Sequence, residues 1–328
     1  MHYKLNLIIN SSLVQAVEAI PADVTSLDLS WNCLGINSGI ELAQIFAAIP
    51  KKITSLDLSW NSFNRMSGAE LAQALAAIPN SVISINLGRN HFSLMEAAEL
   101  AQAIAAIPEG VTDLDLNQNH LDDMSGAKLA QVFAAIPAGV TSLNLTGNGL
   151  GGVGISRVSA LIQAFAAIPN TIVYLNLTSN GFGIIRNGAE LAQLFAAIPA
   201  GVTSLDLRST CLYRLSLADL ALFKNSLPHI QTICLDVSEI RNMSKEQRQM
   251  LSAAFPNIKK ITLADDNNRE VDISQSIEMS NYIRELGLKT EVPSLLHQCS
   301  RFFKERGMEI NNKNVPEELK ELVSRQSL

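Results

Sequence analysis

The side chains best suited to chemistry in this sequence recur at a nearly constant interval. Carboxylates and carboxamides return about every 29 residues in one column, which consists of Asp28, Asp57, Asn86, Asp115, Asn144, Asn176 and Asp206. General acid–base catalysis needs a pair of groups whose surroundings differ from those of other carboxylates, and a regular column singles out no such pair. The sequence also contains no glycine-rich phosphate loop before Lys-Ser/Thr and no Gly-x-Ser-x-Gly turn. We therefore predict that the protein is not an enzyme.

Two histidines have the chemistry to bind a metal ion. His91 and His120 occupy equivalent places in neighbouring copies of a repeated segment, and Asp122 follows closely. Imidazole and carboxylate groups are common zinc ligands. Two neutral histidines at the edge of a loop are the simpler interpretation, so we predict no metal site and no cofactor.

The elements that position these side chains belong to a short repeated unit. Residues 53–61 read Ile-Thr-Ser-Leu-Asp-Leu-Ser-Trp-Asn, and this alternation of apolar and polar residues predicts a half-buried strand. Residues 67–79 are rich in Ala, Leu, Glu and Gln, and they place Leu71, Leu75 and Ile78 on one face, which predicts a helix. A unit of strand, turn, helix and return loop is too small to bury its own apolar face, so the copies must stack.

The strand pattern indicates ten such units. The first leucine-type position of each strand lies at Leu5, Leu27, Leu56, Ile85, Leu114, Leu143, Leu175, Leu205, Ile233 and Ile261. The asparagine that closes the pattern recurs at Asn10, Asn32, Asn61, Asn90, Asn119, Asn148 and Asn180. Prolines follow each helix and stop it at a fixed length. We expect the asparagines to satisfy backbone groups where each chain segment leaves the sheet, and a less regular end from Thr210 onward.

This pattern of Leu-x-x-Leu-x-Leu-x-x-Asn-x-Leu, followed by Gly-Ala-x-x-Leu-Ala-x-x-Leu and Pro, resembles the leucine-rich repeat in its long, ribonuclease-inhibitor-like form. The resemblance implies an α/β horseshoe, with a parallel sheet on the concave side and helices on the convex side. We assign residues 1–267 to this solenoid, with residues 1–22 as a short first unit. The repeated Ala-Ala-Ile-Pro endings also resemble leucine-rich-repeat effectors that intracellular bacteria such as Legionella inject into host cells.

Strand alternation points Ser26, Asp28 and Ser30 onto the concave face. The Asp/Asn column is preceded by a column of serines, in which Asp113 and Tyr174 are the exceptions. It is followed by a column of Ser30, Ser59, Gly88, Asn117, Thr146, Thr178 and Arg208. The face is therefore polar and mildly acidic. Two interpretations remain open, namely a solvated face or a docking surface for a basic or polar patch on another protein.

The column just before the asparagine differs between repeats, whereas the scaffold positions are nearly identical. It reads Trp31, Trp60, Arg89, Gln118, Gly147, Ser179 and Ser209, and it contains both tryptophans of the chain. Trp and Arg dominate binding hot spots, so we expect an exposed anchor here; packing beneath the following loop is the alternative. The residues predicted to bind a partner are Trp31, Trp60, Arg89, Asp28, Asp57, Asn86, Asp115, Gln118, Asn117, Asn144, Tyr174 and Arg208.

Residues 268–328 lack the repeat. The segments 274–286, 292–306 and 316–324 predict short helices that cap the last repeat, as solenoids require; a small effector or docking domain is the alternative. Residues 317–321 (Glu-Glu-Leu-Lys-Glu) resemble the glutamate-rich tail of type IV secretion substrates, although such runs are common on solvated helices. Cys299 is interpreted as a buried cap cysteine, because Cys299-Ser300-Arg301 lacks the Cys-x-Asp of the ubiquitin-ligase domains found in some related effectors.

Charge and composition exclude several classes of partner and location. The formal net charge of −6 argues against general binding of nucleic acid. The four cysteines are scattered without a Cys-x-x-Cys pair, which favours a reducing compartment. The N-terminus lacks the features of a secretory signal, and no apolar run is long enough for a membrane span. We expect a cytoplasmic, monomeric protein that reaches the host cytosol without a cleaved signal peptide.

Together these observations predict a non-catalytic protein-binding module. The resemblance implies a virulence effector that binds and modulates a host protein or another bacterial effector, in the manner of an inhibitor that covers its partner's active site. An enzyme or an adaptor with its activity in residues 268–328 is the alternative. The identity of the partner, the affinity and the host pathway stay open.

Overall fold

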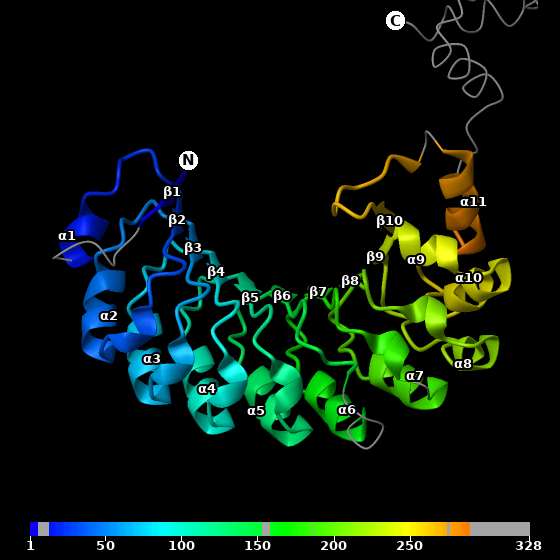
Figure 1. The fold of residues 1–328 in the computed structure, drawn as a ribbon, viewed down its shortest axis with the longest axis horizontal. Coiled ribbons are helices and arrows are strands. Elements are labelled where there is room, and N and C mark those ends of the chain that lie inside the picture. Colours follow the sequence, from blue (N-terminus) through cyan, green and yellow to red (C-terminus); the bar gives the residue numbers. More distant parts are fainter. Residues whose placement is uncertain (6–12, 153–157, 186, 274–275, 289–328) are drawn as a thin grey trace, which may run out of the picture.

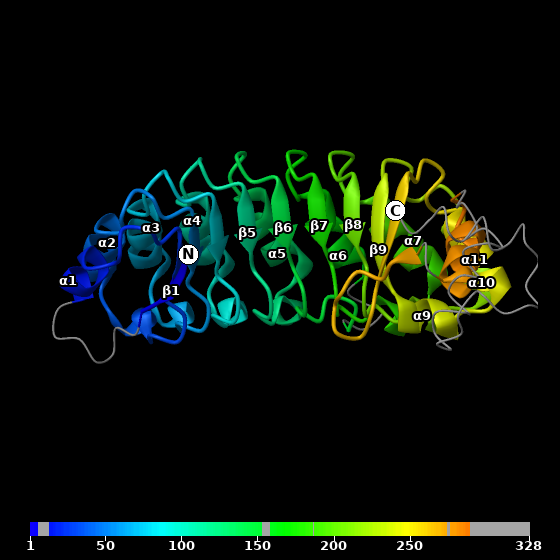
Figure 2. The ribbon, with the colours of Figure 1, turned by 90° about the horizontal axis from the view of Figure 1, so that it is seen from above.

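The computed structural model describes residues 1–5, 13–152, 158–185, 187–273 and 276–288, which form an arc with the sheet inside and the helices outside (Figure 1). Ten strands form one parallel sheet and follow one another in chain order (Figure 2). They are β1 (His2–Lys4), β2 (Ser26–Asp28), β3 (Ser55–Asp57), β4 (Ser84–Asn86), β5 (Asp113–Asp115), β6 (Ser142–Asn144), β7 (Tyr174–Asn176), β8 (Ser204–Asp206), β9 (Thr232–Asp236) and β10 (Lys260–Ala264). The α/β horseshoe predicted from the sequence is confirmed.

The outer layer consists of short α-helices, and a 3-10 turn precedes several of them. The α-helices are α1 (Leu13–Glu18), α2 (Gly39–Ala47), α3 (Gly68–Ala76), α4 (Ala97–Ala105), α5 (Gly126–Ala134), α6 (Val158–Ala166), α7 (Gly188–Ala196), α8 (Leu217–Ala221), α9 (Val237–Asn242), α10 (Lys245–Ser252) and α11 (Ile277–Glu285). The 3-10 turns are η1 (Leu34–Ile36), η2 (Phe63–Arg65), η3 (Phe92–Leu94), η4 (Leu121–Asp123), η6 (Phe182–Ile184) and η7 (Leu212–Arg214). In α3 the Ser67 hydroxyl accepts from the Glu70 N–H, and the Glu70 carboxylate accepts from the Ser67 N–H. This capping box fixes where the helix begins.

The pairing of the first strand differs from the register that the leucine pattern predicted. Tyr3, and not Leu5, pairs with Leu27, so the first unit is shifted by two residues. A shift of two residues preserves which side chains face the core, because strand side chains alternate with a period of two. Apolar spacing alone could not choose between these registers. The observed register places Lys4 beside Asp28.

The core lies between the sheet and the helices. Leu56 and Leu58 are the inward-facing residues around β3, and both are almost completely buried. Phenylalanines fill the space behind the sheet, where Phe165, Phe182 and Phe195 meet edge to face with ring centroids 6.3 and 5.7 Å apart. This geometry is favourable for aromatic pairs. Repeated burial of the same positions makes each repeat depend on its neighbours.

A ladder of buried asparagines joins neighbouring repeats where the strands end. Asn90 is fully buried, and its Nδ2 donates to the carbonyls of Leu58 and Leu87 at 3.1 and 3.0 Å. Its Oδ1 accepts from the N–H groups of Asn61 and Phe63 at 2.9 and 3.4 Å. The two donor bonds recur at Asn32, Asn61, Asn119, Asn148 and Asn180. The ladder satisfies backbone groups that would otherwise be buried without partners.

At the C-terminal end of the ladder, acidic side chains take over the acceptor role of the asparagine. Thr210 occupies the asparagine position, and its hydroxyl donates to the Leu207 carbonyl at 2.5 Å. The next repeat offers carboxylates as acceptors: Asp236 accepts from the Ser209 N–H, and Glu239 accepts from the Cys211 N–H. Burial raises the pKa of Glu239 to about 7, and the nearby charge of Asp236 adds to this effect. The end of the ladder therefore holds a carboxyl group that resists ionisation.

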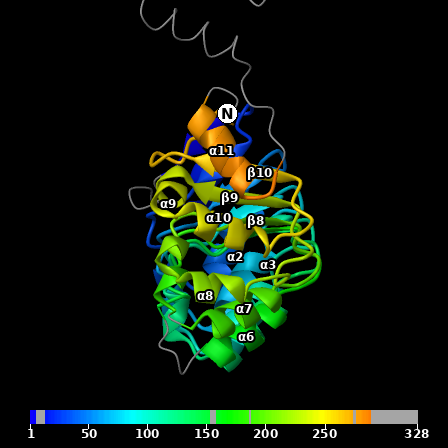
Figure 3. The same ribbon diagram turned by 90° about the vertical axis from the view of Figure 1, so that its right-hand side faces the viewer.

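Helices α10 and α11 close the C-terminal end of the described solenoid (Figure 3). The Arg248 guanidinium is buried, lies 2.5 Å from the Glu285 carboxylate and stacks over the Tyr282 ring at 4.4 Å. Arg241 makes a two-pronged ion pair with Glu278. These contacts fasten α11 to the preceding helices, as expected for the first part of a cap. The boundary between residues 267 and 268 stays a prediction.

Replacing one ladder asparagine should destabilise the fold strongly. We expect Asn90→Ala to lower the free energy of unfolding by about 2–4 kcal/mol, because several buried backbone groups lose their partners. Chemical denaturation monitored by circular dichroism measures this loss. Gln102→Ala removes an exposed amide from α4 and serves as the control, with an expected change within about 0.5 kcal/mol. Equal effects of the two variants would contradict the role assigned to the ladder.

The raised pKa of Glu239 predicts a pH-dependent stability. In the unfolded chain this carboxyl ionises near its ordinary pKa of 4.5, whereas in the fold it keeps its proton until about pH 7. The fold therefore loses stability as pH rises through this interval, on the order of 2 kcal/mol between about pH 5 and about pH 8. Glu239→Gln cannot ionise, so its melting temperature should fall less than that of the wild type over this range. The exposed Glu99→Gln variant should follow the wild type.

Candidate partner-binding surface

Each Asp or Asn of the concave column accepts a hydrogen bond from the backbone two residues later. The Oδ1 of Asp57 accepts from the Ser59 N–H, and the Oδ1 of Asn86 accepts from the Gly88 N–H, both at 2.9 Å. The same bond forms at Asp28, Asp115, Asn144, Asn176 and Asp206. Asp and Asn both supply this turn-forming acceptor. The column thus has a structural role, and the property left to vary within it is charge.

The N-terminal end of the concave column is neutralised within the chain. Asp28 is 9% exposed, and its carboxylate lies 3.1 Å from the Lys4 ammonium. Burial raises the pKa of Asp28, but hydrogen bonds from Ser30 and Lys4 outweigh burial and hold the pKa below its ordinary value. Asp28 is therefore an internally paired anion with little surface for a partner.

The C-terminal end of the column is also internally satisfied. Asp206 is 2% exposed and lies 2.7 Å from the Arg208 guanidinium, and the Tyr174 hydroxyl donates to it at 3.3 Å. Burial and the Asp206 charge raise the pKa of Tyr174 to about 12. Arg208 also donates to Asn268 at 3.0 Å, in the turn after β10 that lies on the inner side of the sheet (Figure 1). Tyr174 and Arg208 belong to this cluster rather than to a surface shared with the tryptophans.

The middle of the concave face carries carboxylates that form no ion pair within the described residues. We call Asp57, Asp113 and Asp115 the acidic face; Asp113 is exposed and the other two are partly exposed. Among the residues that the structure describes, none of the three forms an ion pair. Burial raises the pKa of Asp115, and the charge of Asp57 contributes, while hydrogen bonds from Asn117 and Asn144 oppose the rise. The two column aspartates therefore repel each other across β4.

The two tryptophans and Arg89 form one continuous stack at the carboxyl ends of β2, β3 and β4. The indole centroids of Trp31 and Trp60 are 4.1 Å apart with planes inclined by 20°, and the Arg89 Cζ lies 4.6 Å from the Trp60 centroid. Trp31 is 57% exposed, while Trp60 and Arg89 are partly exposed. Gln118 follows Arg89 in the same column and is also partly exposed. We call Trp31, Trp60 and Arg89 the aromatic edge.

The backbone of the aromatic edge is left-handed. The φ angles are 61° at Trp31 and 57° at both Trp60 and Arg89, and Gly147 has a φ of 64° at the equivalent place in a later repeat. This conformation disfavours residues other than glycine by about 1–2 kcal/mol each. Glycine suits the backbone best here, so large exposed side chains at this position are not required by the fold. Gly147 in the same column is the sequence signal for this backbone conformation.

His91 and His120 also stack, with ring centroids 5.9 Å apart and planes inclined by 3°. Within the described part of the chain, no cluster of three or more His, Cys, Asp or Glu side chains has the geometry of a metal site. His91 and His120 directly follow the buried asparagines Asn90 and Asn119, so side chains of neighbouring repeats also stack on the far side of the ladder position.

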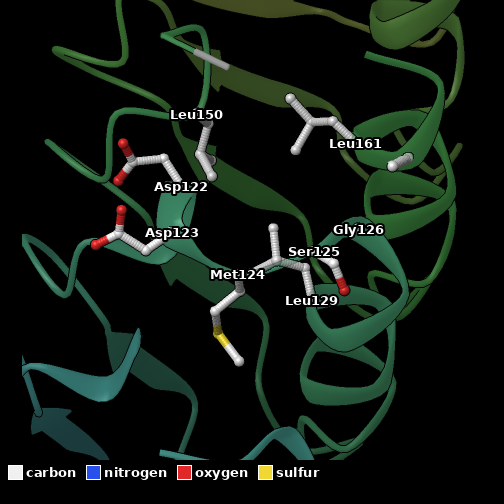
Figure 4. Close-up of a pocket in the computed structure, with 9 residues that line it drawn as sticks. Asp122, Asp123, Met124, Ser125, Gly126, Leu129, Leu150 and Leu161 are labelled. Atoms are coloured by element: carbon white, nitrogen blue, oxygen red, sulfur yellow. The ribbon is translucent and has the colours of Figure 1, made fainter. Parts of the chain in front are cut away.

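A pocket that the sequence did not predict lies between α5 and α6. Its volume is about 200 Å³, and Figure 4 shows the carboxylates of Asp122 and Asp123 on one side and Leu129 and Leu161 on the other. The repeat that supplies Leu150, Ala160 and Leu161 to the lining is longer than usual, with 32 residues between Leu143 and Leu175. The pocket is separate from the aromatic edge.

Several predictions for the C-terminal segment lie outside the described residues. They concern Cys299, the helices at 292–306 and 316–324, and the acidic run at 317–321. The first predicted helix, at 274–286, corresponds to α11 (Ile277–Glu285).

The crystal structure of the leucine-rich repeat-containing protein LegL7 from Legionella pneumophila is similar to this chain. The two sequences are 43% identical, the match covers 90% of this chain and 100% of LegL7, and the TM-score is 0.66. The chain belongs to the leucine-rich repeat family. The family model for the leucine-rich repeat matches residues 22–43 and 140–159.

The C-terminal domain of tropomodulin from Caenorhabditis elegans is 10% identical to this leucine-rich repeat protein. The match covers 48% of this chain and 89% of the tropomodulin domain, with a TM-score of 0.32. No curated protein matches the sequence. In the described residues of this leucine-rich repeat protein, no helix combines the length and apolar character needed to cross a bilayer.

Removing Trp31 should leave this leucine-rich repeat protein nearly as stable as before. Trp31→Gly loses a stacking contact of about 0.5–1.5 kcal/mol but relieves about 1–2 kcal/mol of backbone strain. We therefore expect a change within about 1 kcal/mol in thermal or chemical unfolding. Leu29→Ala in the same repeat removes a fully buried side chain and should cost about 2–5 kcal/mol. A loss of that size for Trp31→Gly would identify the indole as a packing element.

Proposed function

We propose that this protein is a non-catalytic module that binds another protein through the aromatic edge and the adjoining concave face. One observation carries the proposal: the chain displays two tryptophans and an arginine on left-handed backbone where glycine would serve the fold better. Exposed Trp and Arg side chains are the residue types that most often dominate protein–protein binding energy. A stack held in one geometry loses little conformational freedom on binding.

The concave sheet supports the same surface. Its strands are braced by the asparagine ladder and by the turn-forming bonds of the Asp/Asn column, so exposed side chains start from a fixed backbone. Concave sheets of solenoids provide extended binding surfaces of this kind. Asn86, Asn117 and Asn144 place hydrogen-bonding groups beside the carboxylates of the acidic face. The predicted surface therefore combines apolar stacking area with polar groups around it.

The biological setting that we propose is that of a bacterial effector. The sequence resembles Legionella-type effectors, and the similar LegL7 structure comes from Legionella pneumophila. The partner would be a host protein or another effector, whose activity is modulated when the horseshoe covers part of its surface. Binding without catalysis is sufficient for this role, and the protein would act in the host cytosol.

Affinity capture tests this proposal. Tagged wild-type protein is used as bait in host-cell and bacterial lysates, and the captured proteins are identified by mass spectrometry. For a partner that the wild type enriches, Trp31→Gly/Trp60→Gly should lower recovery at least about tenfold, because loss of two hot-spot side chains exceeds about 1.4 kcal/mol.

The matched control is Ile83→Ala/Val173→Ala. Both side chains are 47% exposed and precede their strands, at the opposite edge of the sheet from the tryptophans. This control should recover the partner as well as the wild type does. Undiminished recovery by a correctly folded Trp31→Gly/Trp60→Gly variant would refute the assigned surface.

A further inference from the structure

We infer that the partner segment that docks on this surface is basic, with one arginine or lysine over Trp31 and others over the acidic face. The inference rests on the proposed function and adds the chemical class of the partner. It is carried by two independent features, the open aromatic edge and the unpaired carboxylates beside it.

The chain itself contains an example of the contact that we infer. The Arg89 guanidinium lies over the Trp60 indole at 4.6 Å from the ring centroid, which is the geometry of a cation–π interaction. Trp60 in turn stacks on Trp31, whose side chain is the most exposed of the three. A cationic side chain of the partner placed on Trp31 would extend the stack with the same chemistry.

The acidic face lies within reach of the same segment. Asp57 and Trp60 belong to one turn. The Asp57 carboxylate accepts a hydrogen bond from the N–H of Ser59, and Ser59 directly precedes Trp60. Asp115 lies two strands away, about 10 Å along the sheet. A cationic side chain above Asn86 would lie between these two carboxylates and relieve their mutual repulsion. This charge complementarity selects a basic occupant over an acidic or apolar one.

The structure also limits the length of the docking site. At the N-terminal end Asp28 is paired with Lys4, and at the C-terminal end Asp206 is paired with Arg208. Arg208 is also engaged by Asn268, whose side-chain oxygen accepts a hydrogen bond from the guanidinium. The carboxylates that a partner can use therefore lie between these ends, on β3 and β5, next to the aromatic edge. A short extended segment is long enough to contact both features.

The Asp/Asn column indicates a substitution that tests the charge of the acidic face without changing the turn. Asn86 and Asn144 form the same turn-closing hydrogen bond as the aspartates of neighbouring repeats. Asp57→Asn/Asp115→Asn therefore removes two charges and keeps the turn geometry. Glu99→Gln/Glu109→Gln removes two charges from exposed side chains outside the concave face and is the matched control.

The two tryptophans provide the signal. They are the only ones in the chain and lie in one stack, so intrinsic tryptophan fluorescence reports on the aromatic edge alone. The probe is a short peptide of alternating arginine and serine, titrated into the full-length protein, with a glutamate–serine peptide of equal length as the comparison. We expect the arginine peptide to change the fluorescence saturably and the glutamate peptide to leave it unchanged.

Asp57→Asn/Asp115→Asn should lower the affinity for the arginine peptide at least about tenfold. The Glu99→Gln/Glu109→Gln control should lower this affinity less than about twofold. Equal weakening by both variants, or an unchanged fluorescence with the arginine peptide, would overturn the inference. A captured partner that depends on Trp31 and Trp60 but not on Asp57 and Asp115 would also overturn it, while leaving the proposed function intact. If the captured partner did not depend on Trp31 and Trp60, the proposed function itself would be refuted.

Discussion

The structure depends on satisfying backbone groups at the point where each strand ends. A parallel sheet with one helix per repeat leaves N–H and C=O groups buried there, and buried groups without partners are strongly unfavourable. The side chain of Asn90 bonds to backbone on both its own and neighbouring repeats, and equivalent residues repeat this along the sheet. The apolar core holds the layers together, but this ladder sets the distance and register between repeats. Where it ends, Asp236 and Glu239 take over as acceptors.

Because the ladder and the Asp/Asn turns prescribe so much of each repeat, few positions are free to differ. The left-handed position before the asparagine is one of them, and charge in the Asp/Asn column is another. Both vary from repeat to repeat without disturbing the backbone. The function that we propose therefore assigns specificity to Trp31, Trp60 and Arg89 and to the aspartates without ion pairs, on a scaffold whose buried leucines and asparagines recur from repeat to repeat.

The sequence predicted the scaffold well because the core repeats its chemistry at a constant interval. It placed the strands from β2 onward, the helices of the described repeats and the buried asparagines from Asn32 to Asn180, whereas Asn10 lies outside the described residues. It also identified the tryptophan column as separate from the core. It misplaced the first strand, because pairing Tyr3 or Leu5 with Leu27 gives the same alternation of inward and outward side chains. It treated the Asp/Asn column as surface alone, since a pattern of residue types does not show which oxygen accepts the Ser59 N–H.

Local residue type and spacing by themselves determined the solenoid, since burial of leucines and closure by asparagine follow from period alone. Only the tertiary structure decided which polar residues were available to a partner. Asp28 and Asp57 are equivalent in the sequence pattern, yet the first is paired with Lys4 and the second forms no ion pair among the described residues. Tyr174 and Arg208 are likewise satisfied by Asp206 and Asn268, from repeats and turns distant in the chain. Such pairings depend on distances between side chains, which a one-dimensional pattern does not contain.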